Sequence, residues 1–331
     1  MRLSPVFCSL ISAAAVIIGL SQPAFSQTKW RFGHDQPVPS MYEEGHQAFK
    51  RILAEKSKDA ILIDVFPNAQ LGPEIAMFEG VRLGSLDGMS IHFANAASFV
   101  PELAMFSVSY IFKDQNHYEA VIGDPAFLAK ITNLVAAKNL GIKVLGIYSA
   151  GVRNIYTTKG AASTPDELKG TKIRVMNNPI EAKIWSKFGT IPTPMNFGEV
   201  YQSLQTGVLD AAENGLSTIE SFRHYEAAKT IILTEHQRAS ALLVMNERKF
   251  DALKPEMKKI VLDAAAEACA TERSRDKELN ADAVERMKAK GVTFITPDRA
   301  KFSSLAAPIQ DDVAESLKMS DVLKMVRSKA N

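Results

Sequence analysis

The chain has 331 residues, of which 46% are hydrophobic and 23% are charged, so it is long enough for one large globular domain or two lobes. Its net charge of +2 comes from acidic and basic residues that are interspersed along the chain. The sequence contains neither a basic block typical of nucleic-acid-binding proteins nor an acidic tail typical of a disordered interaction arm.

The first 26 residues differ from the rest of the chain. Arg2 precedes an apolar run from about residue 6 to 20, and small residues follow at Ala24 and Ser26. This order is typical of a secretory signal peptide and predicts cleavage between Ser26 and Gln27. The alternative is a membrane anchor, but the apolar run is shorter than the roughly 20 residues that a spanning helix needs. We therefore expect an exported, soluble chain.

Strands and helices alternate along the mature chain. Alternating apolar residues predict strands at 28–35, 61–67 and 86–93, and apolar residues at helical spacing predict helices at 41–57 and 73–85. The order then repeats, with strands predicted at 141–151, 153–159, 172–176 and 208–214, and helices at 181–189 and 197–207. This alternation predicts an α/β fold with a mostly parallel sheet.

A short internal repeat and one long helical pattern indicate two lobes. The helical segments that start at Met77 and Val200 both continue into Gly-x-Leu-Asp, which suggests two similar lobes rather than one long sheet. The pattern from 255 to 291 is helical, and such a helix spans about 50 Å at roughly 1.5 Å per residue. Because this length exceeds one lobe, we expect the helix to bridge both. Short helices are predicted after residue 298.

Motifs for cofactor chemistry are absent from the sequence. There is no dinucleotide-binding glycine pattern and no P-loop, and GSLDG at 84–88 lacks the serine spacing of a hydrolase. The six histidines show no metal-binding spacing, and Cys269 has no partner in the mature chain, so packing is its expected role. We expect no cofactor and no metal, and a binding protein is favoured over an enzyme.

Arg174 occupies an unusual place in the predicted strand 172–176. Its neighbours Ile173, Val175 and Met176 are apolar residues that favour strands. A planar guanidinium can donate two parallel hydrogen bonds to a carboxylate, which makes Arg174 a candidate ligand-binding residue. The alternative is that the alternation places it on a solvated face.

Four segments carry a resemblance to a known family. They are FPNAQLGPEIAMFEGVRLGSLDGM from residue 66, SAGVRNIYTTK from 149, TPDELKGTKIRVMNNP from 164 and IPTPMNFGEVYQSLQTGVLDAAENG from 191. Together they resemble the substrate-binding proteins of tripartite ATP-independent periplasmic (TRAP) transporters, the DctP-type family. The resemblance covers residues 29 to about 300.

This resemblance implies a two-lobed α/β periplasmic binding protein fold with a ligand cleft between the lobes and a long helix across both. The expected lobes are 27–150 with about 240–280, and 151–239 with about 281–331. Hinge closure would trap a small organic acid for delivery to the TRAP membrane subunits, with uptake driven by an ion gradient. The expected protein is a periplasmic monomer, not an enzyme.

The resemblance also implies roles for individual residues. Arg174 matches the family arginine that binds the substrate carboxylate, and Arg153 matches a second arginine near the ligand. Asn214 matches an asparagine that hydrogen-bonds the carboxylate region, and Phe197 lies where the family has an aromatic wall. A surface salt bridge for Arg153 and a core position for Phe197 are the alternatives. Glu213 either accepts from a ligand hydroxyl or points away from the cleft.

The first part of the chain is expected to supply the variable side of the cleft. Asp35 follows the first strand, Glu74 begins a helix and Asn95 ends a strand, so each is a candidate ligand contact. Glu74 fits equally well as a residue that favours the helix dipole. His34 and His92 reach the same region but are expected to be structural.

The polar residues of the expected cleft indicate the ligand class. Two arginines indicate an anion, whereas Asp35, Glu74 and Glu213 accept hydrogen bonds and would repel a second carboxylate. One carboxylate with several hydroxyls satisfies this set, so a sugar acid, either a uronate or a short aldonate, is the first expectation. A C4-dicarboxylate and an aromatic or branched keto acid are the alternatives within the class. A secreted α/β hydrolase or isomerase is the alternative of a different class.

Overall fold

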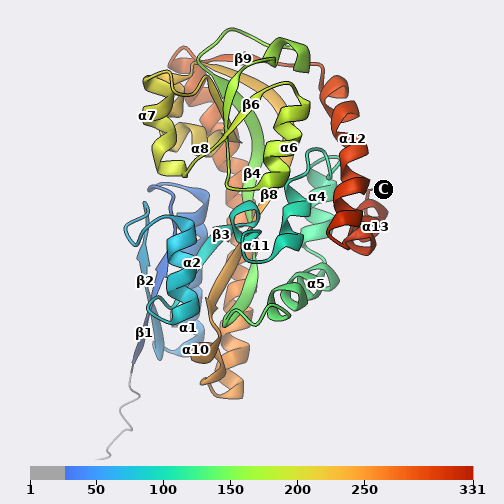
Figure 1. Ribbon diagram of the computed structural model, residues 1–331. Coiled ribbons are helices and arrows are strands. Elements are labelled where there is room, and N and C mark those ends of the chain that lie inside the picture. The colour runs from blue at the N-terminus through green and yellow to red at the C-terminus, as the bar shows by residue number, and fades with distance from the viewer. Residues whose placement is uncertain (1–26, 331) are drawn as a thin grey trace, which may run out of the picture.

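The computed structural model describes residues 27–330 (Figure 1). In this part of the chain a sheet of nine strands has the order β2-β1-β3-β8-β4-β7-β5-β6, and β9 pairs with β8. The strands are β1 (Thr28–Gly33), β2 (Ile61–Phe66), β3 (Gly88–His92), β4 (Ile142–Thr157), β5 (Lys172–Val175), β6 (Ile191–Pro194), β7 (Ala211–Gly215), β8 (Thr230–Asn246) and β9 (Thr293–Ile295).

The predicted parallel pairing is confirmed at the two ends of the sheet and is wrong in its centre. Strand β1 pairs in parallel with β2 and β3, and β5 pairs in parallel with β6 and β7. In the centre, β8 is antiparallel to β3 and β4, and β4 is antiparallel to β7. The two groups of parallel strands belong to two lobes, and the long strands β4 and β8 join them into one hydrogen-bonded ladder.

The two central strands differ most from the sequence prediction. The predicted strands 141–151 and 153–159 are one 16-residue strand, β4, whose register shifts between Ser149 and Val152. At this irregularity the long helix α11 (Pro255–Ala289) supplies the missing partners. The N–H of Ser149 donates to Glu272 (2.8 Å), and the Ser149 hydroxyl donates to Asp276 (2.7 Å). These two hydrogen bonds to α11 stabilise β4 where its register shifts, so it continues as one strand.

Helices cover both faces of the sheet. Predicted helices are present as α1 (Met41–Ser57), α2 (Glu74–Leu83) and α6 (Pro179–Lys187), and the segment predicted at 197–207 is a 3₁₀ turn, η3 (Phe197–Glu199), followed by α7 (Val200–Gln205). The other helical segments are α3 (Phe93–Ala96), η1 (Pro101–Ser107), α4 (Gln115–Ile122), α5 (Pro125–Ala136), η2 (Pro165–Leu168), α8 (Leu216–Ser221), α9 (His224–Ala227), α10 (Glu247–Asp251), α12 (Arg299–Ser316) and α13 (Ser320–Ser328). The predicted short C-terminal helices are thus one of 18 residues and one of nine.

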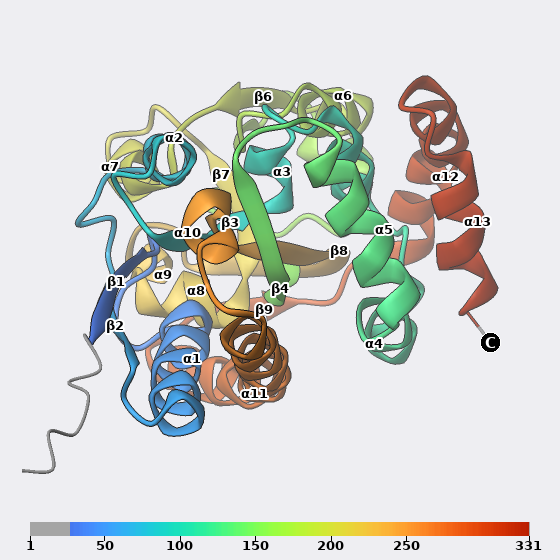
Figure 2. The ribbon, with the colours of Figure 1, turned by 90° about the horizontal axis from the view of Figure 1, so that it is seen from below.

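The long helix α11 packs against both lobes, as expected from its length. Its first half lies beside α1 (Figure 2) and buries Ala265 and Cys269 in a core with Phe49. Its last turns bury Met287 in a second core, with Tyr156 of β4. The expected packing role of Cys269, a free thiol, is confirmed.

The structure also bears on membrane association. Within residues 27–330, none of the helices has the length and apolar character needed to cross a membrane. The predicted signal peptide lies outside the described residues.

The packing of Gly88 in β3 gives a test of the core. A Cβ at Gly88 would lie 2.3 Å from the Phe32 ring and 2.6 Å from the Val244 carbonyl oxygen. We expect Gly88→Ala to lower the free energy of unfolding by about 2 kcal/mol, because the added methyl overpacks the core. Denaturant unfolding of residues 27–331 measures this change.

Gly160 provides the matched control. No atom lies within 4 Å of a Cβ built there, so Gly160→Ala is expected to change stability by less than about 0.5 kcal/mol. Equal stability of the two variants would contradict the packing described for β3.

Candidate functional site

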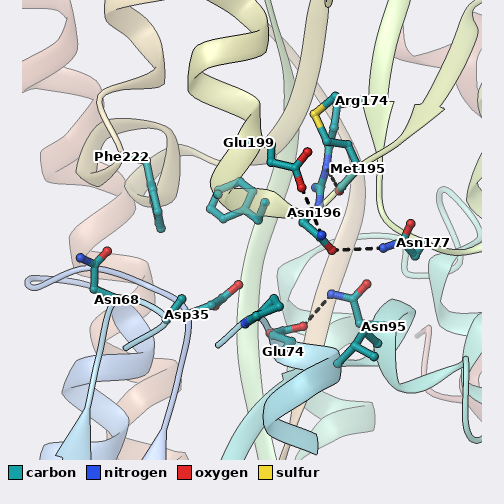
Figure 3. Close-up of a pocket in the computed structure, with 15 residues that line it drawn as sticks. Asp35, Asn68, Glu74, Asn95, Arg174, Asn177, Met195, Asn196, Glu199 and Phe222 are labelled. Atoms are coloured by element: carbon teal, nitrogen blue, oxygen red, sulfur yellow. Dashed lines mark hydrogen bonds between the residues drawn. The ribbon is translucent and has the colours of Figure 1, made fainter. Parts of the chain in front are cut away.

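A polar cavity lies between the two lobes (Figure 3). Its volume is about 320 Å³, and a smaller cavity of about 30 Å³ shares Asp35, Glu74, Asn95, Arg174 and Phe197 with it. The larger cavity is also lined by Asn68, Asn177, Met195, Asn196, Glu199 and Phe222, and the smaller by Gln36, Tyr42, His92, Arg153, Met176 and Asn214. All the predicted site residues except Glu213 therefore line one of these cavities.

Arg174 lies on β5 and is 3% exposed. Its Nε donates to the Met195 carbonyl oxygen (2.9 Å), and its guanidinium lies over the Phe197 ring, 5.4 Å from the centroid. Within residues 27–330 no carboxylate forms an ion pair with it, whereas it lines both cavities. Burial lowers the pKa of Arg174, although an arginine stays protonated in proteins. Its Nη groups are the donors that this arrangement leaves for a ligand.

Arg153, on β4, is committed to a partner within the protein. Its Nε and Nη2 donate to the two carboxylate oxygens of Glu213 (2.5 and 2.8 Å), and its Nη1 donates to Asn214 Oδ1 (3.1 Å). Burial disfavours the charged forms of both groups. The attraction and the hydrogen bonds between the two opposite charges outweigh this effect for each of them. The pKa of Arg153 is raised, and that of Glu213 is lowered to about 2.

Glu213 lines neither cavity. Besides Arg153, His236 Nε2 lies 3.2 Å from its Oε2, and all three side chains are buried. Of the two roles open to Glu213 in the sequence, the structure places it away from the cavity, as the counter-ion of Arg153. For Arg153 the alternative considered from the sequence was a surface salt bridge. The structure instead shows a buried salt bridge, with Glu213.

Asn214 and Phe197 each present one group to the cavity. Asn214 Oδ1 accepts from Arg153 and from the Gly215 N–H (2.8 Å), so its amide nitrogen is left to donate to a ligand. Phe197 packs edge-on against Phe222, with ring centroids 4.6 Å apart, and both rings line the larger cavity. Phe197 therefore forms an apolar wall and is only partly buried.

An acidic pair faces these groups from the first lobe. The Glu74 carboxylate, at the start of α2, accepts from the His92 N–H (3.2 Å) and from Asn95 Nδ2 (2.7 Å), as Figure 3 shows for Asn95. Burial, and then the negative charge of Asp35, raise the pKa of Glu74 to about 8. Burial also raises the pKa of Asp35. The alternative considered from the sequence was that Glu74 only interacts favourably with the helix dipole. Its hydrogen bonds to His92 and Asn95 give it a further role.

The two histidines expected to be structural differ in what they offer. His34 Nε2 lies 2.8 Å from Glu43 and its ring lines neither cavity, so it has a structural role. His92 Nδ1 accepts from the Ala94 N–H (3.1 Å), which assigns the proton to Nε2 because burial lowers the pKa of His92. That Nε2 has no hydrogen-bond partner in the described residues. The residue lines the smaller cavity, but this nitrogen itself is buried.

Several lining residues were not predicted from the sequence. Asn177 directly follows the apolar strand that contains Arg174, and Asn196 precedes Phe197, so both lie inside the segments that carried the resemblance. Asn196 donates to Glu199 (3.1 Å). Asn68 also lies inside such a segment, the one that starts at residue 66, whereas Phe222 comes from a connecting segment where no local pattern marks it. Tyr42 lies on α1, which was predicted only as a helix at 41–57.

The arrangement can bind and orient an anion with several hydroxyl groups. Among residues 27–330 no cluster of three or more His, Cys, Asp or Glu side chains is arranged to hold a metal ion. Two lobes that line one polar cavity define the class of solute-binding proteins.

The comparison with known families agrees with this class. Residues 32–317 match the family described as bacterial extracellular solute-binding protein, family 7. The chain therefore belongs to this family, the periplasmic solute-binding proteins of TRAP transporters, and the predicted family and fold class are confirmed.

Individual relatives are similar over nearly their whole length. The 2,3-diketo-L-gulonate-binding periplasmic protein YiaO of Escherichia coli is 30% identical over an alignment of 333 residues that covers 98% of this chain and 99% of YiaO. A TRAP solute-binding protein from Sulfitobacter sp. NAS-14.1 with bound β-D-galacturonate is 31% identical, with a TM-score of 0.84 over 91% of this chain and 100% of its own. A sugar acid binding protein from Advenella mimigardefordensis in complex with galactonate is 25% identical, with a TM-score of 0.86 over 91% and 98%.

The buried Arg153–Glu213 pair gives a test of the site's electrostatics. We expect Glu213→Gln to lower the free energy of unfolding by about 3 kcal/mol at pH 7, because Arg153 stays buried without a counter-ion. The folded-state pKa of about 2 lies below the ordinary value of 4.5. The advantage of the wild type is therefore full above pH 4.5 and declines as the pH falls toward 2. Denaturant unfolding at a series of pH values measures it.

An exposed ion pair supplies the control. Asp263→Asn removes the surface pair with Lys259, and its expected cost is below about 1 kcal/mol. A Glu213→Gln variant no less stable than Asp263→Asn would contradict a structural role for the buried pair.

Proposed function

We propose that this chain is the receptor that captures a sugar acid, either a uronate or an aldonate, and delivers it to the membrane subunits of a TRAP transporter. The observation that carries the proposal is Arg174, a buried guanidinium that lines the cavity and has no carboxylate partner among the described residues. A ligand carboxylate would accept two parallel hydrogen bonds from it, which fixes the orientation of the ligand as well as contributing binding energy.

The rest of the cavity suits the remainder of a sugar acid. Asn214 has a free donor, and Asn95 and Asp35 have oxygens that accept from hydroxyl groups. Phe197 and Phe222 present apolar faces to the carbon skeleton. The similar proteins from Escherichia coli, Sulfitobacter and Advenella bear names or bound ligands that are all sugar acids with one carboxylate, which supports the same ligand class here.

The remaining features of the proposal follow the family. The chain acts as a monomer that binds its ligand without converting it, since the cavity residues orient a ligand and none forms a nucleophile–base pair. Cleavage between Ser26 and Gln27 releases it into the periplasm. The lobes, 27–150 with about 240–280 and 151–239 with about 281–331, close on the ligand as rigid bodies.

Arg174→Ala tests the proposed carboxylate site. We expect D-galacturonate to bind residues 27–331 and the variant to bind it at least ~100-fold more weakly, because the charge-assisted hydrogen bonds are lost. Titration calorimetry measures both dissociation constants. D-Galactose, which lacks the carboxylate, should not bind the wild type measurably.

Arg51→Ala is the matched control, since Arg51 is exposed on α1 and lines neither cavity. Its affinity for D-galacturonate should equal that of the wild type. Undiminished binding by a folded Arg174→Ala protein would refute the role of this arginine, and turnover of the bound sugar acid would favour the hydrolase or isomerase alternative.

A further inference from the structure

Positive charge around the cavities comes from one side only. In the part of the chain that the structure describes, Arg153 and Arg174 are the only Lys or Arg side chains that line either cavity. The charge of Arg153 is neutralised by Glu213, because the guanidinium donates hydrogen bonds to both carboxylate oxygens of Glu213. One guanidinium, Arg174, is left for a ligand. The site therefore has the positive charge for one ligand carboxylate.

The opposite lobe contributes negative charge to the same space. Asp35 and Glu74 line both cavities, Glu74 is 5% exposed, and Asp35 is partly buried. The groups that hold Glu74 are neutral, namely the His92 N–H and the Asn95 amide. No salt bridge between residues 27 and 330 involves either acid. Among the described residues, Arg174 lowers the pKa of both acids and His34 lowers that of Asp35, so Arg174, the group taken here to hold the ligand carboxylate, is the arginine that offsets their charge.

The protonation of Asp35 and Glu74 is a second reason why this part of the cavity disfavours an added anion. Burial and the proximity of Asp35 raise the pKa of Glu74 to about 8, so the pair retains a proton near neutral pH. A site that keeps a proton on its own carboxyl group already disfavours further negative charge. A hydroxyl group, in contrast, can donate to Asp35 and accept from protonated Glu74.

We propose that Asp35 and Glu74 determine specificity by admitting sugar monoacids and rejecting sugar diacids and C4-dicarboxylates. The inference rests on the proposed function, because it takes the ligand carboxylate to lie on Arg174 and the far end of the ligand to face the acidic pair. A terminal hydroxyl satisfies the pair there. A second carboxylate meets like charge without a cation, and such contacts cost several kcal/mol.

A pair of matched ligands isolates this effect. Galactonate and galactarate differ only at one end, which is a hydroxymethyl group in the monoacid and a carboxylate in the diacid. We expect galactarate and succinate to bind residues 27–331 at least ~100-fold more weakly at pH 7 than the tighter of galactonate and D-galacturonate. Titration calorimetry gives the dissociation constants.

Isosteric variants assign the effect to the pair. In the Asp35→Asn/Glu74→Gln double variant we expect monoacid affinity to fall and the diacid-to-monoacid ratio of dissociation constants to shrink by about tenfold or more, because the like-charge contact is removed. The two single variants replace the double variant if thermal unfolding shows that it does not fold. Asp312→Asn, an exposed carboxylate remote from the cavities, should leave the ratio unchanged.

The outcomes separate this inference from the proposed function. Equal affinity for galactonate and galactarate, or an unchanged ratio in the Asp35 and Glu74 variants, overturns the inference while leaving a sugar-acid receptor. Binding of succinate or galactarate without binding of either monoacid overturns both. Absence of binding by every one of these acids also overturns both.

Discussion

The antiparallel ladder between β4 and β8 is the constraint on which the rest of the structure depends. These strands are 16 and 17 residues long and pass through both lobes, with β3 added to β8 and β7 added to β4. The register of β4 with β7 sets Arg153 opposite Gly215 and Ile155 opposite Glu213, which brings the Glu213 carboxylate within reach of Arg153. This register also places Arg153 and Asn214 side by side at the smaller cavity.

The two buried guanidinium groups at the cavities, those of Arg153 and Arg174, differ in their partners. Arg153 has a carboxylate partner two residues along the neighbouring strand and also lines the smaller cavity. Arg174 is on β5, whose other neighbour is β6, and its contacts are the Met195 carbonyl and the Phe197 ring. One charge is thereby paired within the protein and the other has no carboxylate partner among the described residues, although both side chains are buried.

Local patterns predicted several elements within each lobe and the long helix α11, which packs on both, but they divided the joining strand β4 in two and missed the other joining strand, β8. The strand containing Arg174 and the helices α1, α2 and α6 follow from periodicity alone. Strand β8 was missed because Glu235, His236 and Arg238 interrupt its apolar pattern. His236 and Glu235 have partners far along the chain, at Glu213 and Arg299. The family resemblance located the cavity residues. It left Glu213 open, because its pairing with Arg153 depends on a strand register between residues 60 positions apart.

Arg174 has no ion-pair partner among the described residues, and this bears on the proposed binding of a ligand carboxylate. Burial disfavours its charge, and the more distant carboxylates of Glu213 and Glu181 only partly offset this. A carboxylate on its Nη groups would supply the missing partner in a low-dielectric environment, where charge-assisted hydrogen bonds are strongest. Since the other wall contains an acidic pair that keeps a proton, a second anion would undo that gain. The balance of charge across the cavity thus favours one carboxylate, bound in one orientation.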